Sequence, residues 1–453
     1  MNIQLSEHFT YRKLLRFTFP SIIMMVFTSI YGVVDGVFVS NYVGAESFAA
    51  VNLIMPFLMV LGAVGFMFGT GGSALVAYTL GLGDRKKARE IFSLLIYVLI
   101  AIGFLFTVLG IAFLEPIARL LGADGGMLSY CVRYGRIVLL ALIPFMLQNV
   151  FQSFLITAER PHFGLYITIA AGVSNMILDA FFIAVLKMGV EGAALATAIS
   201  QGIGGLIPLC YFIFCRKGTL YLGRTHLDLR SLARTCSNGA SEFMTNISMS
   251  IVNMLYNWQL MRIMGVDGVT VYGIIMYVNF IFISIFLGYS IGSAPIIGYH
   301  YGAGNQTELQ GLLKKSLRLI GIMSLVLTAL AELLTWPLSR IFVGYDASLH
   351  ALAARAFAIY AVSFLLMGFN IFASSFFTAL NNGAISALIS FGRTLVFQLI
   401  AVLVLPIFFD ADGIWSAVIA AEIAAVILSV ICFIWKEPAY HYGIWKRKEG
   451  KRA

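Results

Sequence analysis

The chain has 453 residues, of which 60% are hydrophobic and only 11% are charged. Soluble domains carry about 25% charged residues, so this composition excludes an ordinary soluble enzyme or binding module and indicates a polytopic membrane protein. The net charge of +9 suits a nucleic-acid binder or a membrane protein with basic loops. The positions of the basic residues decide between these two interpretations.

Twelve apolar segments have the length that a helix needs to cross a bilayer. The first follows Arg16; it exceeds the length of a signal core and lacks a small-residue cleavage site, so we interpret it as a spanning helix. The five cysteines show no paired spacing and predict reduced thiols. The segments lie at residues 14–40, 47–79, 91–114, 128–156, 163–187, 190–215, 235–261, 268–300, 312–335, 350–377, 384–408 and 412–435.

Basic residues gather in alternate connections between these segments. They occur before the first helix, in the second loop (GLGDRKKARE), in the long sixth loop and in the tail WKRKEGKRA, whereas the odd-numbered loops are short and poor in Lys and Arg. Positive charge favours the cytoplasmic side of a membrane. We therefore expect both termini and the even-numbered loops to be cytoplasmic, and no nucleic-acid partner.

The second half of the chain repeats the first at a shift of 221 positions. Such a gapless repeat indicates a duplication, with one lobe at residues 1–221 (helices 1–6) and the other at 222–453 (helices 7–12). Because six is even, the repeats are parallel. The prediction is an all-α fold with two pseudo-symmetric six-helix lobes around a cavity whose access alternates. The shift aligns Gly44 with Gly265, Tyr78 with Tyr299, Gly83 with Gly304, Pro116 with Pro337 and Asn149 with Asn370.

Motifs for an energy-providing or catalytic cofactor are missing from the sequence. It has no G-x-x-x-x-G-K-[ST] motif for a nucleotide and no H-E-x-x-H or Cys/His cluster for a metal. The two G-x-G stretches lie in matching loops and are interpreted as tight turns. No histidine pairs with a nucleophile at a readable spacing. We therefore expect a protein without cofactor or enzyme activity.

Two acids lie inside apolar segments of the first half. Asp35 occurs late in helix 1 (IYGVVDGVFV), and Asp179 is the only ionisable acid or base in residues 163–186. A charge at the centre of a spanning helix costs roughly 2.5–3.5 kcal/mol on insertion scales. The shift places Tyr256 and Ile400 opposite these acids, so the duplication did not keep them. This asymmetry favours a functional role over a structural one.

Polar neighbours extend this pair into a candidate site. Tyr31 precedes Asp35 by four residues and Asn175 precedes Asp179 by four, so each pair shares a helix face, and two further polar residues, Asn149 and Thr197, lie at a plausible depth. Carboxylate, amide and hydroxyl oxygens suit either a hard cation such as Na⁺ or a shared proton. The alternative is that the acids only hold neighbouring helices together.

The second half has intramembrane charges of its own. Glu242 lies early in helix 7 and Glu422 near the middle of helix 12. Either acid can attract a cationic substrate or hold a second proton, or can bond to polar groups of its own lobe. The one basic residue at comparable depth, Arg393, is expected to extend toward the nearby membrane surface.

Together these residues resemble the multidrug and toxic compound extrusion (MATE) family, in particular its bacterial MepA-type branch. The resemblance covers essentially the whole chain. It rests on the twelve helices, the matching loops and four stretches of sequence: DGVFVSNYVGAESFAAVN, NMILDAFFI, MGVEGAALATAISQ and GASEFMTNISMSIVNMLYN.

The resemblance implies efflux of organic cations in exchange for H⁺ or Na⁺ across the cytoplasmic membrane, with Asp35, Asn175, Asp179 and Thr197 as the ion site and Tyr31 and Asn149 near it. It also implies that helix 1 bends at Pro20 when the site changes occupancy. We expect drugs and membrane lipids as partners, and a monomer. The alternative is a lipid or lipid-linked oligosaccharide flippase, which favours a basic cavity; the spanning segments hold few basic residues apart from Arg393.

Overall fold

The computed structural model describes residues 3–43, 45–216, 218–343 and 346–443, and every regular element in these ranges is helical. The helices of the first half are α1 (Tyr11–Tyr42), α2 (Ala45–Gly81), α3 (Arg85–Leu120), α4 (Gly125–Leu140), α5 (Leu142–Thr157), α6 (Pro161–Asp179), the π-helix η1 (Ala180–Val185) and α7 (Val190–Phe214). Those of the second half are α8 (Leu229–Gly302), α9 (Gln306–Val343), α10 (Ala347–Ala361), α11 (Phe364–Ala379), α12 (Gly383–Phe391), the π-helix η2 (Gly392–Val396) and α13 (Phe397–Tyr440).

Several of these elements combine or divide the predicted spans. The 74 residues of α8 turn at Gly265 (φ 67°), and α13 turns at Asp410 (φ 46°), so each contains the end of one predicted helix and the start of the next. The pairs α4–α5 and α10–α11 each form one bent span, with angles of 54° and 44°. With these turns and bends, the described helices follow the twelve predicted segments, six in each half.

The two bends are features that the predicted single helices 4 and 10 did not contain. They occur at Ala141 and Val362, which correspond at the shift of 221. Pro144 has no N–H to donate to the carbonyl of Leu140, which explains why α4 ends there. The second half has no proline at this place, and nothing else in its sequence explains the bend.

The matching G-x-G loops form tight turns, as predicted. Gly83 (φ 83°) and Gly304 (φ 67°) have the left-handed backbone that glycine adopts without a steric penalty. Asp84 Oδ1 accepts the Lys87 N–H at 2.9 Å and Asn305 Oδ1 accepts the Glu308 N–H at 3.1 Å, so each loop also caps the next helix.

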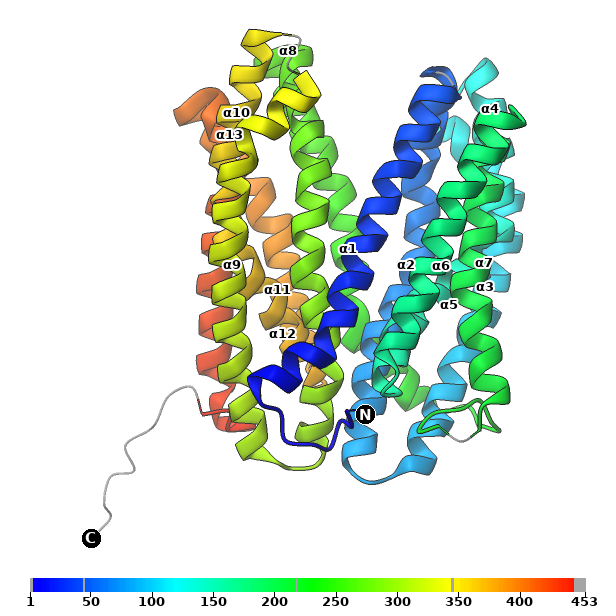
Figure 1. Cartoon of the computed structure of the whole chain (residues 1–453), viewed down its shortest axis with the longest axis vertical. Coiled ribbons are helices and arrows are strands. Elements are labelled where there is room, and N and C mark those ends of the chain that lie inside the picture. The colour runs from blue at the N-terminus through cyan, green and yellow to red at the C-terminus, as the bar shows by residue number, and fades with distance from the viewer. Residues whose placement is uncertain (1–2, 44, 217, 344–345, 444–453) are drawn as a thin grey trace.

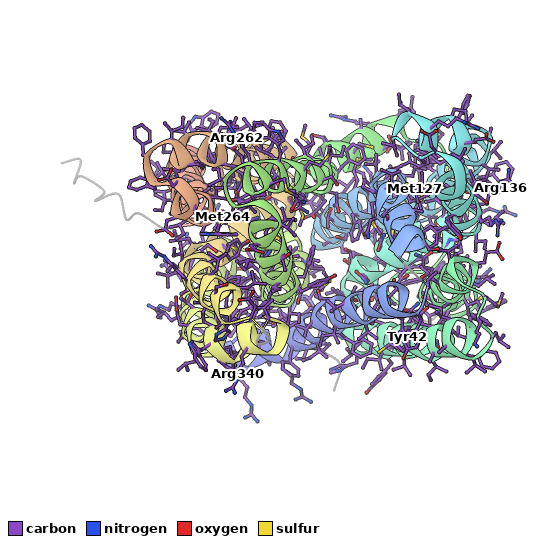
Figure 2. All side chains as sticks on the ribbon, turned by 90° about the horizontal axis from the view of Figure 1, so that it is seen from above. Tyr42, Met127, Arg136, Arg262, Met264 and Arg340 are labelled. Carbon is purple, nitrogen blue, oxygen red and sulfur yellow. The ribbon has the colours of Figure 1, made fainter. Side chains whose placement is uncertain are left out.

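The helices form two bundles, the N-lobe (α1–α7) and the C-lobe (α8–α13), which lie side by side and diverge toward one end (Figure 1). We call the end where α1 begins and the two G-x-G loops lie the basal end, and the other end distal. Viewed from the distal end, Tyr42, Met127 and Arg136 belong to one bundle and Arg262 and Arg340 to the other (Figure 2).

The lobes contact each other near the basal end. There α2 and α8 come so close that a Cβ on Gly81 or Gly302 would collide with the partner's backbone, and a Cβ on Gly292 of α8 would lie 3.1 Å from Thr18 of α1. A hydrophobic cluster fills this region and includes Phe9 and Phe17 together with side chains of the C-lobe. Each lobe also has a hydrophobic cluster of its own.

The segment between the lobes packs on the N-lobe. Leu220 and Leu222 are buried in the N-lobe cluster. Arg89 of α3 donates to the carbonyl of Thr219 at 3.0 Å, and the Thr225 hydroxyl donates to the Glu90 carbonyl at 2.8 Å. The boundary predicted between residues 221 and 222 therefore falls inside a segment that stays attached to α3 as far as Thr225.

Candidate functional site

The last residue of α6 and a residue late in α1 bring two carboxyl groups together inside the N-lobe. Asp179 is fully buried, and Asp35 is half-buried; the groups are near enough to interact electrostatically and to form a hydrogen bond when one is protonated. Neither oxygen of Asp179 has a hydrogen-bond partner, nor does Oδ1 of Asp35. Two carboxylates in contact repel each other strongly at low dielectric constant. This pair therefore favours a shared proton or a bound cation.

The backbone changes its helix type directly after Asp179. The α-helical bonds of α6 end there, and η1 continues as a π-helix over six residues. Single π turns inside helices occur often at functional sites, because they re-aim side chains and leave backbone groups less regularly paired.

Asn175 and Tyr31 each lie one helical turn before one of the two acids. Asn175 lies one turn before Asp179, is 2% exposed, and its Oδ1 has no hydrogen-bond partner. Tyr31 lies one turn before Asp35, near Gln148 of α5 and close to Gly172 of α6. Tyr31 thus lies where α1, α5 and α6 meet.

The remaining predicted residues of the N-lobe are Asn149 on α5 and Thr197 on α7. Asn149 of α5 is buried, and its Nδ2 has no hydrogen-bond partner. Because adjacent residues of a helix project in different directions, Asn149 does not share the helix face of its neighbour Gln148. Thr197 of α7 lines a cavity of about 50 Å³ together with Tyr134 and Gln201.

Sequence reasoning did not single out three further polar residues of this region, Tyr134, Gln148 and Gln201. Tyr134 is 2% exposed, lines this cavity and lies in the vicinity of Asp35 and Asp179. Gln201 is buried with Oε1 unpartnered. The repeat contained a signal for Gln201, because the shift of 221 places it opposite Glu422.

Unpartnered oxygen acceptors are the common feature of this region. Asp35, Asp179, Asn175 and Gln201 all contribute at least one buried oxygen without a donor. Buried acceptors are normally paired, and carboxylate and amide oxygens are the ligands that hard cations prefer. Among the described residues, no group of three or more His, Cys, Asp or Glu could hold a metal ion.

The C-lobe acid Glu422 is in a different environment. It is 1% exposed and accepts the Arg393 Nε–H at 2.8 Å and the Asn370 Nδ2–H at 2.7 Å. The expectation that Arg393 extends to the membrane surface is therefore wrong. The guanidinium turns inward, because the buried carboxylate of Glu422 attracts it more strongly than the membrane surface does. Glu242 of α8 is half-buried and is also under the influence of the Arg393 charge.

The predicted hinge residue, Pro20, lies inside the uninterrupted helix α1. Its neighbours Thr18 and Ser21 contact Gly292 and Gly288 of α8. The basal third of α1 is thus fixed against the C-lobe, whereas Asp35 lies on the part beyond Pro20.

A second, larger cavity of about 270 Å³ lies away from all of these residues, at the basal end of the N-lobe. Charged side chains of α3 and of the segment before α8 line it, among them Asp84, Lys87 and Asp228. It contains no predicted site residue.

Comparison with known proteins decides the family. The family model MatE matches the chain twice, over residues 20–181 and 243–404, in corresponding parts of the two lobes. The chain belongs to the MATE family. Similar MATE relatives include the multidrug export proteins MepA of Staphylococcus saprophyticus (25% identical over 437 residues) and of Staphylococcus haemolyticus (25% over 430 residues), and each match covers 94% of both chains.

Solved structures confirm the MATE fold of twelve helices in two lobes. An outward-facing multidrug resistance MATE transporter of the MOP superfamily has a TM-score of 0.91 with this chain, at 22% identity, over 96% of this chain and 98% of that one. The apolar helices, together with membership of the MATE family and the similarity to bacterial MepA proteins, identify the chain as a multi-pass membrane protein of bacteria.

Proposed function

We propose that this protein is a multidrug efflux transporter that exports organic cations in exchange for H⁺ or Na⁺. The observation that carries the proposal is the Asp35–Asp179 pair, whose buried oxygens have no donor. The names of the MepA relatives support multidrug export. Two acids in contact inside a membrane protein are stable only when a cation or proton joins them, so their occupancy can be coupled to the position of the lobes.

In the proposed cycle the ion binds Asp35 and Asp179 from the distal side, with Asn175, Thr197, Tyr31 and Asn149 around it. Occupancy shifts the lobes so that the basal side opens, and the drug leaves on the opposite stroke. Helix α1 bends at Pro20, because its basal part is fixed to α8 while the part that carries Asp35 is not.

Of the two C-lobe acids, Glu242 is proposed to act on the substrate, because Glu422 already has Arg393 as its counter-charge. We propose that the basal end and both termini lie in the cytoplasm of the bacterial cell, which the basic loops favour. We also propose a monomer surrounded by lipid.

The test is transport in proteoliposomes. A fluorescent organic cation such as ethidium is followed under an imposed pH gradient and then under an imposed Na⁺ gradient. We expect one gradient to drive export in the wild type, and Asp179→Asn and Asp35→Asn to reduce it to the rate without a gradient. Asp124→Asn is the control, because Asp124 is exposed and its side chain makes no capping bond.

Two results would contradict this function. Movement that neither gradient drives would favour the flippase alternative, which the same liposomes can test with a fluorescent lipid. Gradient-driven movement that survives both substitutions would mean that the acids only hold α1 and α6 together.

A further inference from the structure

The C-lobe contains a buried ion pair that is held in place on several sides. Arg393 is 13% exposed and donates through Nε to Glu422 Oε1. Asn370 of α11 donates to the other oxygen of Glu422 and to its backbone carbonyl, at 2.7 and 3.0 Å. Ser429 of α13 orients Asn370 by donating to its Oδ1 at 3.1 Å. Both oxygens of Glu422 are thus occupied.

The repeat shows what the N-lobe has at the same positions. At the shift of 221, Asn370 corresponds to Asn149, Glu422 to Gln201 and Arg393 to Gly172. The amide was kept in both lobes, but the charges were not. Where the C-lobe has an acid and a base, the N-lobe has a neutral amide and a glycine, and the amide groups of Asn149 and Gln201 have unpartnered atoms.

Both lobes therefore contain buried acids, but among Asp35, Asp179 and Glu422 only Glu422 has a fixed counter-charge. Asp35 and Asp179 lack any basic partner among the described residues. Arg393 is permanently protonated and is covalently part of η2, so it cannot leave Glu422 for solution as a proton or Na⁺ can leave a carboxylate.

We propose that Arg393 is a built-in counter-ion: it neutralises the buried acid Glu422 of the C-lobe, as the exchanged ion neutralises the Asp35–Asp179 pair of the N-lobe. It thereby confines ion exchange to the N-lobe and sets the number of ions moved in each cycle. This proposal rests on the proposed antiport function. It assigns Glu422 to structure and leaves Glu242 as the C-lobe acid available to a substrate.

The local backbone fits this role. Arg393 is the second residue of the π-helix η2, and Gly392 before it allows a close approach to α13, since a Cβ there would lie 3.1 Å from Leu428 and 3.3 Å from Phe397. Other titratable groups that face the pair are Tyr256 of α8, Tyr360 of α10 and Glu242 of α8. None of these three groups is a base, so none of them can replace Arg393 as a cation.

The first test measures ions per substrate. Proteoliposomes are held at zero membrane potential with K⁺ and valinomycin, under a tenfold gradient of the coupling ion, and the final ethidium ratio across the membrane is measured. Each additional exchanged ion multiplies that ratio by about ten, because the two free energies balance at the end. We expect Arg393→Gln to raise the ratio about tenfold, since Glu422 becomes a second ion site.

Two variants separate charge from damage. Arg393→Lys keeps the positive charge and is expected to keep the wild-type ratio. The double variant Arg393→Gln/Glu422→Gln removes both charges and leaves no unpaired acid, so it also keeps the wild-type ratio and remains informative if Arg393→Gln alone fails to fold. A tenfold fall in the double variant would show that Glu422 itself exchanges an ion and would overturn the proposal.

A second measurement does not depend on transport. Dicyclohexylcarbodiimide reacts with protonated, buried carboxyl groups, and mass spectrometry locates the product. At pH 6 we expect Glu422 to be modified in Arg393→Gln but not in the wild type or in Arg393→Lys. Modification of Glu422 in the wild type would overturn the proposal. So would a folded Arg393→Gln variant in which Glu422 is not modified and the ethidium ratio is unchanged. If neither gradient drives the wild type, the antiport function fails, and this labelling still decides the role of Arg393.

Discussion

Oδ1 of Asn175 is the atom that best distinguishes Na⁺ from H⁺ at the candidate site. It is buried next to Asp179 without a donor. Sodium needs several oxygen ligands, whereas a proton shared by two carboxyl groups needs none from Asn175. If Na⁺ is the coupling ion, we expect Asn175→Leu to raise the half-saturating Na⁺ concentration in transport about tenfold, which corresponds to about 1.4 kcal/mol. If H⁺ is the coupling ion, we expect the pH dependence to change little.

Asn279→Leu provides the matched control for this substitution. Asn279 is also buried with an unpartnered Oδ1, but it lies on α8 in the C-lobe. It should leave the half-saturating ion concentration unchanged. Equal effects of the two variants would point to a general loss of stability and against a ligand role for Asn175.

At the scale of single residues, charge was the predictable part of the site. Asp35 and Asp179 stood out because ionisable groups are costly in apolar helices, and the structure brings them together. Tyr134 and Gln148 did not stand out, because tyrosine and glutamine in a spanning helix are compatible with many packing roles. The inward turn of Arg393 was not predictable either, since it depends on where Glu422 lies in three dimensions.

At the scale of helices, Gly172 sets the distance between α1 and α6. A Cβ on this residue would lie 2.6 Å from Phe27 Cε1 and 2.7 Å from Tyr31 Cδ1, so alanine must displace these two rings or the helix that carries them. Overpacking of this kind costs about 1–3 kcal/mol. Because α1 carries Asp35 and α6 carries Asp179, we expect Gly172→Ala to weaken ion affinity about tenfold in the transport assay, although it removes no polar group.

Gly202→Ala on α7 is the control, because its Cβ would meet nothing within 4 Å. It should transport like the wild type. Normal ion affinity in Gly172→Ala would show that the two acids tolerate a wider separation than the proposed site allows.

Helix positions were largely readable from hydrophobic length, and the fold class followed from the repeat. The internal geometry of the helices was not. The π turns after Asp179 and around Arg393 leave no mark in composition, and the bend at Val362 has no proline or glycine next to it. These features depend on how neighbouring helices pack, which a single sequence does not state.

At the scale of the whole molecule, the N-terminal segment of residues 3–10 ties the lobes together at the basal end. The Leu5 N–H donates to Glu159 of the N-lobe at 2.8 Å, and the Phe9 N–H donates to Glu308 of the C-lobe at 2.9 Å. Glu308 also pairs with His8 at 2.6 Å, and the Phe9 side chain is fully buried. Alternating access requires the basal end to open, so the segment must lose its bonds to at least one of the two lobes in each cycle.

We therefore expect Glu308→Ala to shift the lobes toward a basally open arrangement. Hydrogen bonds to a charged group are worth about 1.5–3 kcal/mol each, so loss of this carboxylate should raise the ratio of open to closed molecules tenfold or more. Spin labels on the exposed positions 82, in the α2–α3 loop, and 307, in the first turn of α9, report the distance between the lobes by pulsed electron resonance in a protein without its native cysteines. Glu115→Ala removes an exposed distal pair with Arg119 and should leave the distance distribution unchanged. A distribution that Glu308→Ala also leaves unchanged would mean that the contacts of α1 and α2 with α8 alone keep the basal end closed.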